Sequence, residues 1–348
     1  MTEWIECTLD KLGEIVGGAT PSTKCEDYYG GSIPWITPKD LSSFKGRYIT
    51  SGERNITEKG LASCSAQMMP KDAVLFTSRA PIGYVAIASQ SVCTNQGFKS
   101  IVVNEKADPL FVYYLLKYNK DAIEAMGSGT TFKEVSGKTM RAVKVRIPLD
   151  VSYQNRIAAV LDSLDTKIEN NERINDNLQQ QAQAIYSSMF IDNPDPAWSH
   201  GHLSDLITVK YGKDHKKLAD GIYPVYGSGG IMRYVERPLY NKESVLIPRK
   251  GTLNNVMYVN QPFWSVDTMF YTEMKLPNVA KFVYHFVKAK DLASMNAGSA
   301  VPSMTTDILN AMEVVIPSAS GLEEFESLVA PMLSLIHISE PTRPRLIS

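Results

Sequence analysis

Cysteine is scarce in this sequence of 348 residues, with four scattered through the first quarter of the chain: Cys7, Cys25, Cys64 and Cys93. Their spacing argues against a disulfide framework and against a zinc site. No apolar run approaches the roughly 20 residues of a membrane span. The N-terminus, MTEWIECTLD, carries acids where an export signal carries bases. These absences predict a cytoplasmic chain with free thiols and no membrane partner.

Catalytic motifs are also missing. The sequence has no G-x-x-x-x-G-K-[ST] phosphate loop, no Asn-Pro-Pro-aromatic motif of a base methyltransferase, and no zinc spacing among its histidines. Asp267 with Glu273 and Lys275 faintly resembles the metal cluster of nucleases, and six residues along one strand would place both carboxylates on one face. We therefore expect no catalysis and no cofactor or metal, with a metal-dependent nuclease that uses these three residues as the alternative.

The stretch from residue 152 to 190 contains neither Gly nor Pro. Its apolar residues recur at alternating steps of four and three over about five heptads, as in the seam of a coiled coil. This spacing predicts one helix roughly 58 Å long, N-capped by Ser152 and ended by Pro194 and Pro196. The alternative is a long core helix. The seam residues expected to bind a partner are Ile157, Leu161, Leu164, Ile168, Leu178 and Ile185.

The two sides of this helix repeat one another at a spacing of roughly 170 residues, which is too long for a solenoid. Each side opens on a Trp and a Leu-rich turn, continues through a Gly-rich loop and a β-type run with an Arg-bearing turn, and closes on a strand ending in Ile-Pro. Each also holds one short aromatic helix. The expected fold class is therefore α+β, with two similar globular domains joined by a long coiled-coil helix.

The domain boundaries follow from these elements. We expect a first domain at 1–150, the long helix at 151–192, a second domain at 193–318, and the start of a second helix at 319–335. Residues 336–348 lose the heptad pattern and hold two prolines, which predicts a non-native or disordered tail and a second helix cut short.

The overall net charge of -1 hides two basic stretches. Nine lysines and arginines stand against four acids between residues 207 and 251, and five stand against one between 133 and 146. Such patches on a neutral protein can follow a phosphate backbone, and a solvated mixed surface is the alternative.

Arginine and amide side chains in loops can bind base edges, and Lys, Ser and Thr can hold phosphates. The candidates in the first half are Thr37, Lys39, Ser78, Arg79, Asn95, Gln96 and Lys133. Those in the second half are Lys213, Tyr226, Ser228, Arg249, Lys250, Asn254 and Asn255. For each alone, a turn or surface role is the alternative. Another hypothesis is a structural coiled-coil protein whose two ligand domains have nothing to do with DNA.

Seven short segments carry a resemblance to a known family: Gly17–Ser22, Ile33–Leu41, Ser78–Gly83, Thr94–Phe98, Gln154–Asp162, Tyr223–Gly230 and Pro248–Gly251. Through them the chain, from Trp4 to about Leu335, resembles the specificity subunit of a type I restriction-modification system. It looks C-terminally truncated, because the second helix stops early.

The resemblance implies two target-recognition domains, each reading half of a split site in double-stranded DNA. It implies two antiparallel helices that space these domains and dock two modification (methyltransferase) subunits, with restriction subunits joining through the complex. The subunit itself would catalyse nothing, and a restriction-methylation enzyme remnant or a metal-dependent nuclease is the alternative. S-adenosylmethionine and ATP would act on the partner subunits.

Overall fold

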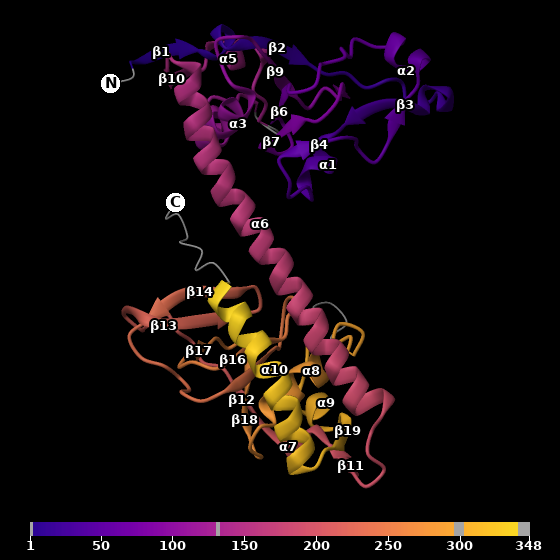
Figure 1. The fold of residues 1–348 in the computed structure, drawn as a ribbon, viewed down its shortest axis with the longest axis vertical. Coiled ribbons are helices and arrows are strands. Elements are labelled where there is room, and N and C mark those ends of the chain that lie inside the picture. The colour runs from indigo at the N-terminus through magenta and orange to yellow at the C-terminus, as the bar shows by residue number, and fades with distance from the viewer. Residues whose placement is uncertain (1–2, 130–132, 296–302, 340–348) are drawn as a thin grey trace. The chain divides into compact units, whose positions relative to one another are not determined.

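The structure, a computed structural model, describes residues 3–129, 133–295 and 303–339 (Figure 1). The chain divides into two compact units, Met1–Lys167 (unit 1) and Ile168–Ser348 (unit 2). The boundary falls inside one long helix, α6 (Val151–Ser187), so this helix supplies residues to both units. Among the described helices, none is long and apolar enough to span a bilayer.

Unit 1 is built on a five-stranded sheet whose order is β2 (Gly13–Gly17), β9 (Lys99–Val103), β6 (Val74–Ser78), β7 (Ile82–Ala88) and β4 (Tyr48–Ile49). A three-stranded sheet places β3 (Tyr29–Ile36) between β5 (Asn55–Ile56) and β8 (Cys93–Thr94). The first strand, β1 (Trp4–Thr8), pairs antiparallel with the last, β10 (Lys144–Pro148). The helices are η1 (Leu9–Lys11), η2 (Glu26–Tyr28), α1 (Pro38–Ser42), α2 (Glu58–Ala62), α3 (Pro109–Tyr118), α4 (Lys120–Ala125) and α5 (Gly137–Ala142).

Unit 2 has a four-stranded sheet whose order is β12 (Ile207–Tyr211), β18 (Met269–Met274), β15 (Ser244–Pro248) and β16 (Met257–Val259). Beside it, β13 (Asp220–Gly227) lies between β14 (Gly230–Val235) and β17 (Trp264–Ser265). Strand β11 (Ser199–His202) pairs antiparallel with β19 (Glu313–Ile316). The helices are α7 (Leu203–Leu206), α8 (Ala280–Lys288), α9 (Thr306–Asn310) and α10 (Ala319–Ser339).

The two units repeat one pairing scheme. In each, the first and last strands pair antiparallel, as β1 with β10 and β11 with β19. In each, the middle strand of the small sheet has one antiparallel and one parallel neighbour, which in unit 1 are β5 and β8 and in unit 2 are β14 and β17. In each, one aromatic helix, α3 or α8, contributes buried residues to the core of the main sheet. The prediction of two similar α+β domains joined by a long helix is therefore confirmed.

Helix α6 begins at Val151, but its capping residue differs from the predicted one. The Asp150 side chain accepts a hydrogen bond from the Ser152 amide at 2.9 Å, so Asp150 is the capping residue and the prediction of Ser152 is wrong. Both residue types cap well, and sequence alone does not rank two that stand two positions apart. The helix ends in a single π turn, η3 (Ser188–Asp192), and Asn193 Nδ2 donates to the Ser188 carbonyl at 3.0 Å.

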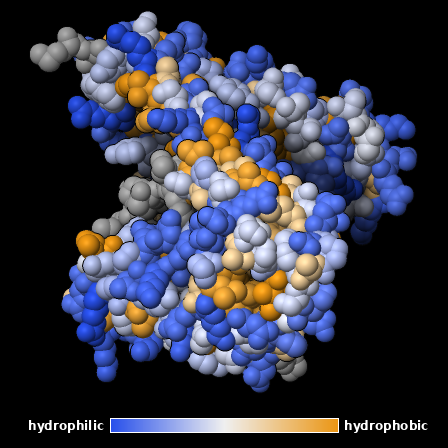
Figure 2. Space-filling model, turned by 60° about the horizontal axis from the view of Figure 1, so that its bottom comes forward, coloured by the Kyte–Doolittle hydropathy of each residue, from blue (hydrophilic) through white to orange (hydrophobic). Residues whose placement is uncertain are grey.

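The apolar seam of α6 is divided along its length. Ile157 packs against the core of unit 1, while Leu178 and Ile185 pack against the core of unit 2. Three predicted partner-binding residues between these contacts remain 37%, 55% and 43% exposed: Leu161, Leu164 and Ile168. On the face shown in Figure 2, hydrophobic residues lie in separate patches among hydrophilic ones. Such patches can serve as protein contacts.

Aromatic rings join α6 to the rest of unit 2. The ring of Phe190 lies 4.8 Å from that of Phe282 on α8 and 5.2 Å from that of Phe325 on α10. Tyr186 stacks on His285 at 6.1 Å. Helix α10 therefore packs into unit 2 through Phe325, and it continues to Ser339. The rest of the predicted tail, 340–348, lies outside the described residues.

Acid is expected to destabilise unit 2 through His285. Burial, and then the nearby Lys288 ammonium, lower the pKa of His285 to about 3 from its ordinary 6.5. The unfolded chain therefore binds this proton more tightly than the folded chain does. The free energy of unfolding should fall by about 1.4 kcal/mol per pH unit as the pH drops from about 6.5 to about 3, between the two pKa values. Urea unfolding at several pH values measures the slope. It should flatten in His285→Phe, and an unchanged slope in that variant would contradict the assignment.

Candidate nucleic-acid interface

Loops from several elements of unit 1 meet beyond the ends of β2, β3, β6 and β8. Three backbone hydrogen bonds join them: Ala19 N to Thr94 O at 3.0 Å, Asn95 N to Ile36 O at 3.0 Å, and Ser78 N to Gly97 O at 2.7 Å. These contacts gather the predicted residues around Thr37, Arg79 and Gln96 into one loop cluster.

Unit 2 has a matching loop cluster beyond β12, β13, β15 and β17. Four backbone hydrogen bonds join its loops: Gly212 N to Met269 O at 3.0 Å, Lys213 N to Ser265 O at 2.8 Å, Val266 N to Tyr226 O at 3.1 Å, and Arg249 N to Thr268 O at 2.9 Å. The predicted residues Lys213 and Arg249 therefore lie on loops in direct contact, and Tyr226 lies beside them near the end of β13.

The two clusters share details of their construction. A Cβ on Gly18 would lie 2.1 Å from the Asn95 carbonyl oxygen, and one on Gly212 would lie 2.0 Å from that of Val266, so each loop requires glycine at its closest approach. A tryptophan indole also fixes each loop. Trp35 Nε1 donates to the Ala19 carbonyl at 3.1 Å, and Trp264 Nε1 donates to that of Lys213 at 2.8 Å.

Arg79 follows β6 in unit 1, and its side chain is 36% exposed. Its Nη1 lies 3.6 Å from Oε2 of Glu134, whose other oxygen lies 3.7 Å from Nζ of Lys99. One carboxylate thus holds two cations in place. Gln96 and Lys133 are exposed beside them. The sequence reasoning missed Lys99 and Glu134, because the bond between residues 79 and 134 depends on the pairing of β6 with a distant loop.

Three other predicted residues of unit 1 serve the loop framework. Ser78 is fully buried, and its Oγ donates to the Gly97 carbonyl at 3.2 Å, so it presents no donor to solvent. The Thr37 hydroxyl donates to Asp40 Oδ2 at 2.6 Å as part of the cap of α1. Asn95 Oδ1 accepts from the Gly97 amide at 2.9 Å.

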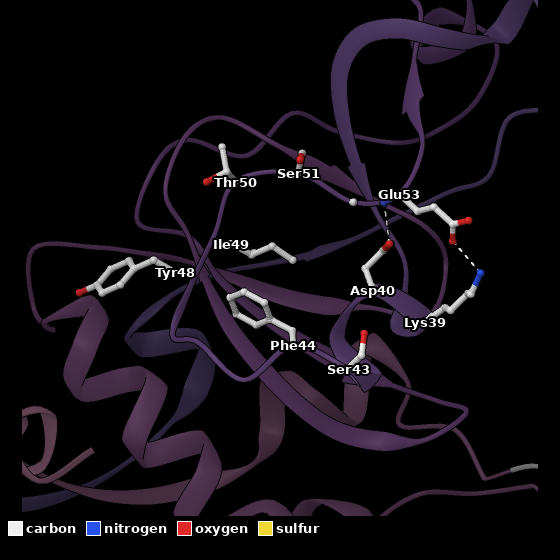
Figure 3. A pocket seen from close by; sticks show the side chains of 10 residues that line it. Lys39, Asp40, Ser43, Phe44, Tyr48, Ile49, Thr50, Ser51 and Glu53 are labelled. Carbon is white, nitrogen blue, oxygen red and sulfur yellow. Dashed lines mark hydrogen bonds and ion pairs between the residues drawn. The ribbon is translucent and has the colours of Figure 1, made fainter. Parts of the chain in front are cut away.

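Lys39 lies at the rim of an open cavity of ≈ 380 Å³ (Figure 3). Its ammonium pairs with Glu53 at 2.6 Å, and this hydrogen bond raises the pKa of Lys39. Asp40 accepts from the Glu53 amide at 2.7 Å, and Phe44 and Tyr48 line the cavity beyond. Lys39 is 78% exposed in its side chain, so a phosphate could compete with Glu53 for it.

In unit 2, the guanidinium of Arg249 lies 5.4 Å from the centre of the Tyr211 ring, and its Nη1 donates to the Asp267 carbonyl at 3.4 Å. Lys213 and Lys250 are exposed. Tyr226 is half-buried against Phe263. These two contacts, with the Tyr211 ring and the Asp267 carbonyl, orient the Arg249 guanidinium.

The two asparagines and Ser228 hold the loops of unit 2 together. Asn255 Nδ2 donates to the Ser228 carbonyl at 2.7 Å. Asn254 donates to Asp291 at 2.9 Å and accepts from the Ala293 amide at 3.0 Å. Both polar ends of the Asn254 amide are therefore engaged within the protein.

The nuclease alternative finds no support in the arrangement of its residues. Asp267 precedes β18, whereas Glu273 lies near the other end of that strand, roughly 20 Å away at the rise of a β-strand. Glu273 faces Lys210 at 3.8 Å, and Lys275 donates to the Ser204 carbonyl at 2.6 Å. Among the described residues, no group of His, Cys, Asp and Glu could hold a metal ion.

Two repeated α+β domains on one long helix, each with a loop cluster that presents an arginine, define a duplicated recognition protein. A family model for the type I restriction modification DNA specificity domain matches residues 1–180 and 197–322, and the chain belongs to this family.

Relatives match over most of the chain. The type I restriction enzyme MjaIX specificity subunit of Methanocaldococcus jannaschii is 31% identical over 380 residues, which cover 96% of this chain and 88% of that protein. The EcoprrI specificity subunit of Escherichia coli is 23% identical, over 94% of this chain and 88% of that protein. The crystal structure of a type I restriction-modification system S subunit from M. genitalium superposes with a TM-score of 0.67 at 17% identity, over 97% of this chain and 91% of that one. This last likeness supports the fold.

Proposed function

We propose that this chain is the non-catalytic DNA-recognition subunit of a type I restriction-modification complex in the cytoplasm. Each domain binds one half of a bipartite site in double-stranded DNA. Helix α6 docks two modification subunits, and restriction subunits join through the complex. Methylation uses S-adenosylmethionine and cleavage uses ATP, and both bind to those partner subunits.

The observation that carries this proposal is the repetition of the loop cluster. Arg79 and Arg249 follow equivalent strands, β6 and β15, and each is oriented by a neighbouring loop. An oriented guanidinium can bind guanine by two hydrogen bonds, which distinguishes one base pair from the others. The exposed Lys133, Lys213 and Lys250 are suited to phosphates. Two copies of such a surface suit a site in two parts.

The exposed seam of α6 supports the partner assignment. Leu161, Leu164 and Ile168 follow one another at steps of three and four residues, about one helical turn, so they form an apolar stripe along α6. A protein partner that covers this stripe would remove it from water, which stabilises an interface.

Genome-wide methylation mapping tests the proposal. The chain is co-expressed with the modification subunit, and the methylated sites are determined. We expect a split motif, two short specified blocks with a fixed gap, and DNA binding that weakens steeply as salt rises. Methylation or binding with no preference among sequences would exclude the recognition role.

A further inference from the structure

Helices α3 and α8 carry the same short motif. Residues 111–117 read Phe-Val-Tyr-Tyr-Leu-Leu-Lys, and residues 282–288 read Phe-Val-Tyr-His-Phe-Val-Lys. The first two residues of each copy are buried in the core of their own domain. Each copy of the motif therefore begins with two residues in the core of its domain and ends with a lysine.

The lysine occupies the same place in both copies. Lys117 lies 5.1 Å from the centre of the Tyr113 ring and Lys288 lies 5.0 Å from that of Tyr284, so each ammonium rests on the tyrosine four positions before it. Each also reaches α6. Lys117 lies 3.7 Å from Asp165 Oδ2, and Lys288 donates to Gln179 Oε1 at 2.8 Å.

The residue after the tyrosine also contacts α6 in both copies. The Tyr114 hydroxyl donates to Asp165 Oδ2 at 3.0 Å, and burial together with this bond raises the pKa of Tyr114. In the second copy, Nδ1 of His285 lies 2.9 Å from Oε1 of Gln183. Two polar contacts per copy thus join equivalent helices to α6, each within its own unit.

In unit 1 a third contact reaches the same face of α6. Arg47, which precedes β4, has its Nε 2.6 Å from Asp162 Oδ1 and donates through Nη2 to Thr166 Oγ1 at 2.8 Å. Its side chain is 11% exposed. A guanidinium so withdrawn from water requires its carboxylate partner. Asp165 and Thr166 lie three and four positions after Asp162, so both neighbour it on the surface of the helix.

These polar contacts continue beyond the apolar packing of unit 1 on α6, which includes Ile157 and Ala158. Apolar contact is non-directional and tolerates rotation, whereas the hydrogen bonds from the Arg47 guanidinium, the Tyr114 phenol and the Lys288 ammonium weaken as their geometry changes. The polar set is therefore suited to fixing an angle.

We propose that the repeated motif of α3 and α8, together with Arg47, fixes the rotation of each domain about α6 and thereby sets the gap between the two half-sites. These side chains are positioning residues, and the claim about the gap depends on the function proposed above.

The test uses the double variant Asp162→Asn with Asp165→Asn, which removes two charges without changing side-chain size. The complete complex is offered duplexes whose half-sites, taken from methylation mapping, are separated by the native gap or by one base pair more or less. We expect the preference for the native gap to fall at least fivefold while the preferred bases in each half-site stay the same. The charge exchange Arg47→Asp with Asp162→Arg keeps an ion pair between these two positions. It should therefore retain part of the gap preference that the Asn double variant loses.

Glu6→Gln is the matched control, because it neutralises an acid of unit 1 that pairs with Lys144 at 3.0 Å on an exposed strand. It should keep the native gap preference. An equal loss of binding at all three gaps in the Asn variant, or an unchanged preference, would overturn the proposal.

A second measurement separates this proposal from the proposed function, since it needs no DNA. Spin labels are attached through non-natural residues at exposed positions 59 on α2 and 167 on α6, and the distance between them is recorded. The Asn double variant should broaden the distance distribution, while Glu6→Gln should not. An unchanged width would overturn the positioning role whatever the DNA assay gives, and absence of a split motif in the unaltered complex would count against the proposed function alone.

Discussion

Replacing Arg79 by alanine should weaken binding to one half of the DNA site by about 1–3 kcal/mol, or roughly 5- to 150-fold, and should relax base preference only there. Arg249→Ala should do the same in the other half. Because the two residues belong to separate loop clusters, their effects should add, and the double reversal Arg79→Glu with Arg249→Glu should abolish selective binding. Titration of duplexes mutated in one half-site at a time measures each effect.

The matched control for charge is Lys11→Glu. Lys11 is exposed in η1, before the start of β2, whereas the loop cluster lies beyond the end of that strand. It should change affinity little and leave both half-site preferences intact. If Lys11→Glu weakened binding as much as Arg79→Glu, the contribution of Arg79 would be general charge rather than base recognition.

Phe325→Ala should destabilise unit 2 by about 3–5 kcal/mol, the usual cost of removing a buried phenyl ring. The Phe325 ring is fully buried and contacts those of Phe190 and His285 at 5.2 and 5.7 Å. Urea unfolding followed by tryptophan fluorescence would measure the loss, since Trp198 lies 5.4 Å from Phe190. Leu328→Ala, on the same helix but 45% exposed, is the control and should cost only about 0.5 kcal/mol. A loss of that small size in Phe325→Ala would show that α10 is not held through this ring.

The sequence allowed the long helix and the two domains to be predicted because their evidence is local or repeated. A stretch without Gly or Pro and with heptad spacing has few other solutions, and an internal repeat gives each domain a second copy for comparison. The aromatic helices could be predicted for the same reason, although their contacts with α6 could not. The equivalence of Tyr114 and His285 becomes meaningful only once Asp165 and Gln183 are seen beside them.

The candidate site was predictable as a set of loops but not residue by residue. All five residues of β6 are buried, so the alternation that usually separates inward from outward side chains is absent, and Ser78 could not be recognised as internal. Thr37 and Asn254 carry suitable donors and acceptors, but these groups are occupied by Asp40 and by Asp291 with Ala293. Short polar side chains serve loops and ligands equally well, and only the fold distinguishes the two uses.

The pairing of β1 with β10, and of β11 with β19, bears on how one domain can be exchanged for another by recombination. In each domain the first and last strands are paired, so the two ends of the domain lie next to each other. Domains of this form tolerate insertion and replacement, because their ends are already together. A recombination event that exchanged the gene segment between two such strands would give a protein with a new half-specificity and an unchanged α6.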